Sequence, residues 1–161
     1  MIKVGERIPA LNVTVAAAGK HDSVSAADLF AGKKVVLFAL PGAFTPTCSA
    51  AHLPGYVVNA DAFRARGVDM IACLSVNDAF VMEAWGKAQN AEAITMLADG
   101  GAALTKALGL AMETGDFGGM RSQRYAMILE DGVVKTLNVE APKQFEVSKA
   151  ETLLAALQED Q

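Results

Sequence analysis

The feature that most constrains the fold is a regular alternation of short apolar runs with longer amphipathic stretches. Four runs rich in apolar and β-branched residues predict strands: Leu11–Val15, Lys34–Leu40, Val68–Val76 and Ile94–Leu97. Helical patterns lie between and after these runs, at Ala26–Phe30, Pro46–Arg66, Ala79–Gln89, Ala102–Leu108 and Lys149–Leu157. Strands that alternate with helices are joined by parallel crossovers, so the chain predicts an α/β fold.

The end of the chain adds a different element to this α/β pattern. Two further apolar runs, Tyr125–Leu129 and Val133–Val139, flank the dipeptide Asp131-Gly132, which is typical of tight hairpin turns. A hairpin contributes antiparallel strands, so we expect a mixed sheet.

Three of the predicted helices carry markers of where they begin or bend. Asp78 precedes the helix that starts at Ala79 and suits its N-cap. Ser148 and Glu151 match a capping box at the last helix. Pro54-Gly55 should interrupt or kink the long helix between Pro46 and Arg66.

Composition bounds the class of protein. No linker, charge run or repeat divides the 161 residues, so we expect residues 1–161 to form one domain. A hydrophobic fraction of 52% with a net charge of −4 argues against disorder and against nucleic acid as a partner. The N-terminus lacks the apolar core of a signal peptide, and no run approaches the roughly 20 apolar residues of a spanning helix. We therefore expect a cytoplasmic protein that does not bind membranes and keeps its two cysteines reduced.

The segment from Pro41 to Cys48 directly follows the buried strand Lys34–Leu40 and leads into a helix. A loop in this position lies over unpaired helix N–H groups and the positive end of the helix dipole. Pro46 suits the first helical turn, which places Cys48 in that turn. An anionic sulfur is favoured at such a place.

A reactive cysteine needs partners as well as a helix start. The Thr45 hydroxyl can donate to a bound oxygen, backbone N–H groups can form an anion nest, and a fixed cation is still required. From the residues alone two alternatives remain open: Cys48 is a small buried hydrophobe, and Thr45 is only an N-cap.

The sequence Pro-Gly-Ala-Phe-Thr-Pro-Thr-Cys-Ser at residues 41–49, with His-Leu-Pro-Gly-Tyr at 52–56, closely resembles the active-site segment of type II, peroxiredoxin-5-like peroxiredoxins. The resemblance continues through residues 72–82, through Arg-Tyr-Ala-Met at 124–127 and through Asp-Gly-Val-Val-Lys at 131–135. It implies a thioredoxin-like fold with a mixed central sheet flanked by helices and with extra N-terminal strands. It also implies a thiol-dependent peroxidase that reduces hydrogen peroxide and organic hydroperoxides.

The resemblance assigns roles to matching positions. It makes Cys48 the peroxidatic nucleophile, Thr45 its hydroxyl partner and Arg124 the fixed cation. Arg121 is the competing cation, and Arg124 is preferred because it matches the family's arginine-aromatic step into the strand. The supporting positions are Pro41, which shields the sulfur, Gly42, Thr47 and His52.

His52 has two readings. It follows Cys48 by four residues, which suits a contact with the sulfur or with Arg124 from the same helix face. A histidine that only packs the helix is equally compatible with the pattern. His21, in a predicted turn beside Asp22, needs no functional role.

The chain departs from the family at the resolving cysteine, because it has none near its C-terminus. Cys73 lies inside the predicted strand Val68–Val76 and is expected to be structural. The sequence thus predicts a 1-Cys enzyme that is regenerated by an external thiol, either glutathione with glutaredoxin or thioredoxin. No spacing suits a metal or nucleotide, and we expect no cofactor.

Apolar residues such as Phe44 and Phe80 outside the predicted core suggest a homodimer, which the resemblance also implies. Met82 and Trp85 fall at helical spacing with Phe80 and are expected in the core or a dimer contact. Two other functions stay open: a peroxide sensor that relays Cys48 oxidation to a partner protein, and a thioredoxin-fold scaffold without chemistry.

Overall fold

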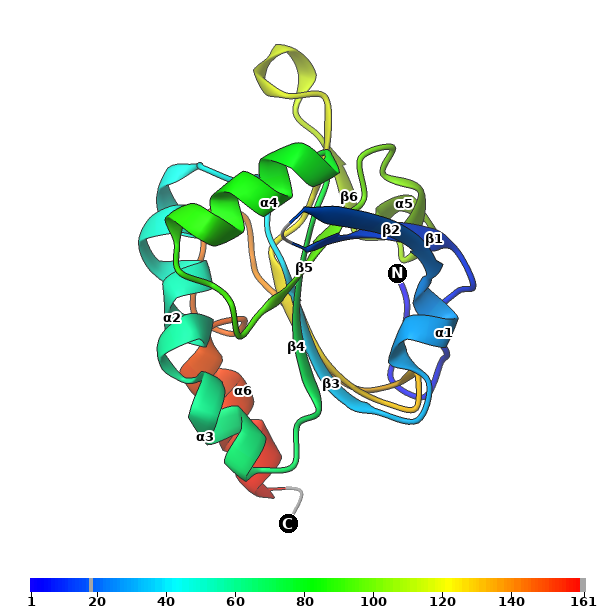
Figure 1. Ribbon diagram of the computed structural model, residues 1–161. Coiled ribbons are helices and arrows are strands. Elements are labelled where there is room, and N and C mark those ends of the chain that lie inside the picture. Colours follow the sequence, from blue (N-terminus) through cyan, green and yellow to red (C-terminus); the bar gives the residue numbers. More distant parts are fainter. Residues whose placement is uncertain (18, 160–161) are drawn as a thin grey trace.

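The computed structural model describes residues 1–17 and 19–159 (Figure 1). Seven strands form one sheet in the order β2-β1-β5-β4-β3-β8-β9, and β6 and β7 form a small second sheet. The strands are β1 Asn12–Ala17, β2 Lys20–Ser25, β3 Lys34–Ala39, β4 Met70–Ser75, β5 Thr95–Ala98, β6 Ala111–Glu113, β7 Met120–Ser122, β8 Tyr125–Glu130 and β9 Val133–Val139. The helices are α1 Ala26–Phe30, α2 Leu53–Val58, α3 Ala60–Ala65, α4 Ala79–Ala88, α5 Ala103–Ala107 and α6 Ala150–Glu159, with a π-helix at Cys48–His52 and a 3₁₀ turn at Gly115–Phe117.

The large sheet is mixed, as the alternating pattern and the closing hairpin predict. β3, β4 and β5 run parallel, whereas β8 pairs antiparallel with β3 and β9 pairs antiparallel with β8. Helices α2, α3, α4 and α6 cover one face and α1 and α5 the other (Figure 1). This architecture confirms the expected α/β class with a central sheet between helices.

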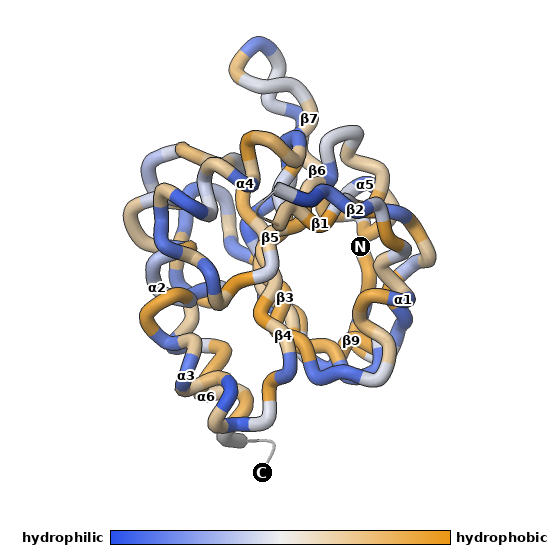
Figure 2. Tube along the Cα trace, viewed as in Figure 1, coloured by the Kyte–Doolittle hydropathy of each residue, from blue (hydrophilic) through white to orange (hydrophobic). Residues whose placement is uncertain are grey.

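The central strands are apolar throughout because both of their faces are covered. In β3, Val36 and Phe38 pack into the core beneath α2, α4 and α6, while Val35 and Leu37 pack into the core beneath α1 and α5. Apolar residues concentrate along these strands in Figure 2. A fully buried side chain of this kind contributes about 1.5–3 kcal/mol, so the strand anchors the loop that follows it.

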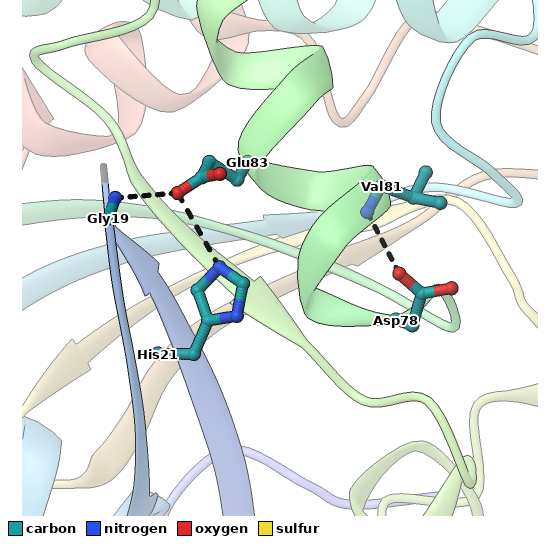
Figure 3. A network of polar contacts seen from close by, with 5 residues as sticks. All are labelled: Gly19, His21, Asp78, Val81 and Glu83. Carbon is teal, nitrogen blue, oxygen red and sulfur yellow. Dashed lines mark hydrogen bonds and ion pairs between the residues drawn. The ribbon is translucent and has the colours of Figure 1, made fainter.

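The N-terminal strands form a hairpin that the sequence predicted only in part. The residue pattern predicted β1 but not β2, because the sequence of β2, Lys-His-Asp-Ser-Val-Ser, is polar and lies at the sheet edge; only the family resemblance implied further N-terminal strands. His21 therefore belongs to a strand and not to a turn. Figure 3 shows how α4 holds this hairpin: the Glu83 carboxylate accepts a hydrogen bond from Gly19 N–H at 2.8 Å and lies 3.5 Å from His21 Nε2.

Two expected helix features are realised differently, and one is confirmed. Asp78 caps α4 by accepting from Val81 N–H at 2.9 Å (Figure 3). The expected capping box at the last helix is wrong, because the Ser148 hydroxyl donates to Glu140 at 2.7 Å. This bond holds the segment that precedes α6 to the end of β9.

The predicted helix Pro46–Arg66 is interrupted, as Pro54-Gly55 predicts, but the irregular turn lies just before the proline. Pro54 lies in the first turn of α2, and a second interruption of the helix lies at Asn59, between α2 and α3. The irregularity comes earlier, in the π-helix, where Leu53 N–H donates to Cys48 C=O five residues back. Pro54 has no N–H and its ring crowds the carbonyl four residues back, so a widened turn just before it relieves the conflict.

Among residues 1–17 and 19–159, we find no helix long and apolar enough to cross a membrane.

Candidate active site

Cys48 lies near the start of a helical segment, where the sequence predicts it. β3 ends at Ala39, the loop crosses over, and the helix begins at Pro46, with Ser49 N–H bonding to Thr45 C=O at 2.9 Å. The side chain of Cys48 is buried, with 1% exposed. The first-turn N–H groups and the helix dipole therefore act on a sulfur that is shielded from bulk water.

Arg124, immediately before β8, reaches this sulfur. Its Nη2 lies 3.2 Å from Cys48 Sγ, and its Nη1 donates to His52 Nδ1 at 2.8 Å. The guanidinium fork therefore spans two partners on the π-helix. A positive charge at this distance can stabilise negative charge that develops at the reacting atoms.

His52 is held as a neutral ring of defined tautomer. Its Nδ1 accepts from Arg124, so Nε2 carries the hydrogen and donates to Ser148 C=O at 3.2 Å. Burial lowers the pKa of His52 to about 3, the charge of Arg124 acts in the same direction, and the Ser148 carbonyl opposes both. The ring thus orients Arg124 without adding a second positive charge.

The Thr45 hydroxyl points back into its own loop. It donates to Gly42 C=O at 2.7 Å, and Ala43 N–H donates to Asn77 Oδ1 at 3.0 Å. A Cβ at Gly42 would lie 3.2 Å from Thr45 Cγ2, so a larger residue there would press on the Thr45 side chain. Phe44 completes the turn with a φ of 62°, a left-handed conformation that a bulky residue adopts only at a cost. To donate to a peroxide, Thr45 must release the Gly42 carbonyl.

Pro41 and Thr47 line a pocket of about 660 Å³ together with Arg124. Most of the lining is apolar, and part of it comes from the loop that follows β9. The lining residues are Pro41, Thr47, Met112, Gln123, Arg124, Glu140, Ala141, Pro142, Lys143, Gln144 and Phe145. A pocket of this size accommodates more than hydrogen peroxide.

Arg121, the competing cation, has other partners. Its Nη1 donates to Val76 C=O at 2.9 Å and its Nε to Gly118 C=O at 3.0 Å. These contacts brace the loop after β4 against β7. The geometry thus distinguishes the two arginines, and only Arg124 has its guanidinium on the sulfur.

The chain matches the family model described as Redoxin over residues 3–154. It is 49% identical to peroxiredoxin-2E-2, chloroplastic, from Oryza sativa subsp. japonica, over 97% of this chain and 72% of that protein. The reduced Prx3 of Vibrio vulnificus in complex with H2O2 is 65% identical and superimposes with a TM-score of 0.95, covering 98% of this chain and 99% of the other. Peroxiredoxin 5 from Alvinella pompejana is 36% identical with a TM-score of 0.86, covering 99% of both chains.

The chain belongs to the redoxin family, as a type II peroxiredoxin. It therefore has the thioredoxin-like fold that the active-site motif implied, and it is a thiol-dependent peroxidase. The chemistry that the site must perform is attack by a thiolate sulfur on a peroxide oxygen.

The second cysteine of this peroxiredoxin is also buried, but it lies inside a central strand and not at a helix start. Cys73 lies in β4, opposite Phe38 of β3, and is 0% exposed. Burial, together with the neighbouring Cys48, raises the pKa of the Cys73 thiol well above its ordinary value. No group of three or more His, Cys, Asp or Glu side chains suited to a metal ion occurs in the part of this peroxiredoxin that the structure describes.

Sequence reasoning missed a second layer of residues around the site. Tyr56 donates to Ser148 C=O at 2.7 Å and stacks on Phe38 with centroids 3.9 Å apart. Trp85 Nε1–H donates to Ser49 Oγ at 3.0 Å, which ties α4 to the residue after the nucleophile. Tyr56 was within reach of prediction, since it closes the motif at 52–56, but no local pattern points to Ser148.

Proposed function

We propose that Cys48 is the peroxidatic cysteine of this peroxidase and that Arg124 is the cation that activates it. The contact of 3.2 Å between Arg124 Nη2 and Cys48 Sγ carries the proposal. It is supported by the neutral His52, which accepts from Nη1 and leaves the charge of the guanidinium to act on the sulfur.

The reaction begins when the Cys48 thiolate attacks one oxygen of a hydroperoxide. A sulfur–oxygen bond forms while the oxygen–oxygen bond breaks, and the departing alkoxide or hydroxide takes up a proton to leave as alcohol or water. Cys48 becomes a sulfenic acid, oxidised by two electrons. An external thiol then forms a mixed disulfide with release of water, and a second thiol regenerates Cys48 as its own disulfide forms.

The loop residues support the substrate oxygens. Arg124 and the first-turn N–H groups stabilise negative charge on the departing oxygen. When substrate binds, the Thr45 hydroxyl leaves the Gly42 carbonyl and donates to a peroxide oxygen instead. The absence of a side chain at Gly42 leaves room for the Thr45 side chain to rotate. Pro41, on the pocket wall beside Arg124, shields the sulfur from bulk water, and Thr47 on the same wall supports the bound substrate.

We propose that an external thiol resolves the sulfenic acid in a 1-Cys cycle. This is supported by the position of Cys73 inside β4, between β3 and β5, and by its raised pKa, which makes its thiolate scarce. Glutathione with glutaredoxin is the first candidate reductant and thioredoxin the second. We propose the cytoplasm as the site of action, where such thiols are kept reduced.

We propose that the protein forms a homodimer through the face that carries Phe44 and Phe80. Phe44 is 56% exposed and Phe80 is 76% exposed, and large apolar side chains left in water favour an interface. Sedimentation of the wild-type protein and of Phe80→Glu tests this. A dimer that dissociates in the variant supports the assignment, and a monomeric wild type contradicts it.

Peroxide consumption by the whole chain, followed in parallel with glutathione plus glutaredoxin and with thioredoxin, tests the functional proposal. We expect steady turnover with one of these reductants, and none in Cys48→Ser. If the protein reduces one equivalent of peroxide and neither reductant supports a second turnover, the result would favour a peroxide sensor over a peroxidase. Turnover retained in Cys48→Ser would reject Cys48 as the nucleophile.

A further inference from the structure

We propose that Glu140 is a positioning residue for Arg124. It orders the loop at residues 141–148, which supplies the hydrogen-bond acceptor that fixes His52. The inference rests on the role of Arg124 proposed above and adds a residue that does not contact the sulfur.

Glu140 follows β9 directly and bonds two parts of the chain at once. Its backbone N–H donates to Arg124 C=O at 3.0 Å, which extends the pairing of β8 with β9 to the arginine itself. Its Oε2 accepts three hydrogen bonds: from Glu146 N–H at 2.7 Å, from Ser148 N–H at 2.8 Å and from the Ser148 hydroxyl at 2.7 Å. Glu140 therefore fastens the far end of the loop to the strand end that carries Arg124.

The charge of Glu140 gives this fastening its strength. The side chain is buried, with 9% of the residue exposed, and none of the ion pairs in the part of the chain that the structure describes includes it. A buried carboxylate without a cation is costly unless donors replace water. Three donors converge on one oxygen here, and hydrogen bonds to an ionised acceptor are about twice as strong as neutral ones.

Ser148 passes this order to the active site through its carbonyl. The carbonyl oxygen accepts from the Tyr56 hydroxyl at 2.7 Å and from His52 Nε2 at 3.2 Å. A carbonyl oxygen has two lone pairs, so these two donors use its full capacity. Because Glu140 holds both the N–H and the hydroxyl of Ser148, the carbonyl has a defined direction and His52 a defined tautomer.

The same loop also contacts Arg124 from another side. The Phe145 ring centroid lies 5.7 Å from Arg124 Cζ and 5.0 Å from the His52 ring centroid. Release of the loop would therefore remove the acceptor from His52 and the aromatic wall from the guanidinium together. Arg124 would keep its charge but spend less time with Nη2 directed at the sulfur.

Two substitutions at Glu140 test this chain of contacts. Glu140→Ala removes the acceptor, and Glu140→Gln keeps an oxygen but loses the charge. Glu146→Gln is the matched control, because that exposed carboxylate belongs to the same loop while only its backbone N–H meets Glu140. The rate of Cys48 oxidation should fall about tenfold or more in Glu140→Ala, fall less than about fivefold in Glu140→Gln and stay unchanged in the control.

The second measurement is ¹⁵N NMR of the His52 ring, which is readily assigned because the chain has two histidines. The wild type should show the Nε2–H tautomer and no protonation down to about pH 4, since the pKa is about 3. Burial is the largest cause of that low pKa, so water entering in Glu140→Ala should raise it and mix the tautomers. Arg124 before β8 bonds the His52 ring directly, Cys48 shares that guanidinium, and Tyr56 on α2 packs beside the ring. Glu140 after β9 reaches the ring only through Ser148, and Glu151 of α6 acts on the neighbouring Tyr56.

An unchanged His52 spectrum in a folded Glu140→Ala protein would overturn the proposal, whatever happens to the rate. A lost rate with an unchanged spectrum would overturn it too, because the loss would then not pass through His52. If Glu140→Ala does not fold, Glu140→Gln against its control decides by the same two criteria. The spectrum tests the link from Glu140 to His52 even if Arg124→Lys keeps full activity, an outcome that would reject only the role proposed for Arg124.

Discussion

Arg124→Lys is the substitution for which the structure gives the sharpest expectation. The guanidinium uses one nitrogen for Cys48 at 3.2 Å and the other for His52 at 2.8 Å. A lysine ammonium is a point charge and can keep only one of these contacts. A lost hydrogen bond that involves a charged group costs about 1.5–3 kcal/mol, and 1.4 kcal/mol is about tenfold in rate, so the second-order rate constant for oxidation should fall about 10-fold to 100-fold.

The chain contains its own probe for this measurement. Trp85 is the single tryptophan and donates to Ser49, the neighbour of Cys48, so stopped-flow fluorescence should follow oxidation of the sulfur directly. Arg121→Lys is the matched control, because Arg121 bonds backbone carbonyls away from the sulfur and should lose little rate. Thermal unfolding of both variants separates a rate effect from a folding defect. If Arg121→Lys loses as much rate as Arg124→Lys, or more, the assignment of the cation is wrong.

Three further expectations follow from the two cysteines and from His52. Cys48→Ser should abolish peroxide reduction whereas Cys73→Ser should keep most of it, and equal losses in a turnover assay would reject the division of roles. One equivalent of peroxide should leave a Cys48 sulfenic acid that dimedone traps for mass spectrometry, and a Cys48–Cys73 disulfide formed as fast as peroxide is consumed would make Cys73 a resolving cysteine. The pKa of His52 is about 3 when folded and has an ordinary value of 6.5, so the unfolded chain binds the extra proton and stability falls as pH drops from 6.5 towards 3. Urea unfolding should therefore give about 2 kcal/mol less stability at pH 5 than at pH 7.5, and a His52→Gln variant with the same difference would contradict this origin.

The sequence by itself determined the features that depend on neighbours a few residues apart. The apolar run at Lys34–Leu40 predicted a strand buried on both faces, and β3 is one. Ala26–Phe30 predicted α1 with the same bounds, and Asp78 predicted the start of α4. The loop at residues 41–48 identified the family and the expected nucleophile, because a strand end, a proline in the first turn and a cysteine form one local pattern.

Apolar patterns in the sequence did not reveal the strands that are polar or very short. β2 was missed because an edge strand exposed to solvent needs no apolar run. β6 and β7, three residues each, carry too few positions for a period to appear. Pro54 predicted an interruption of the helix but not its form, because the sequence shows that a regular turn is unfavourable there and does not show that the backbone widens into a π-helix.

Only the tertiary structure decided which side chains meet at the sulfur. The sequence left Arg121 and Arg124 as competitors, and the pairing of β8 with β3 brings the second of them to the π-helix. The sequence did not decide whether His52 only packs the helix or has a polar role. In the fold, Arg124 bonds one ring nitrogen and the carbonyl of Ser148 bonds the other. Hydrogen bonds of this kind need segments far apart in the chain to be placed to within a few tenths of an ångström. Local propensity and periodicity do not determine that placement. It is determined by how the two hydrophobic cores pack against the sheet.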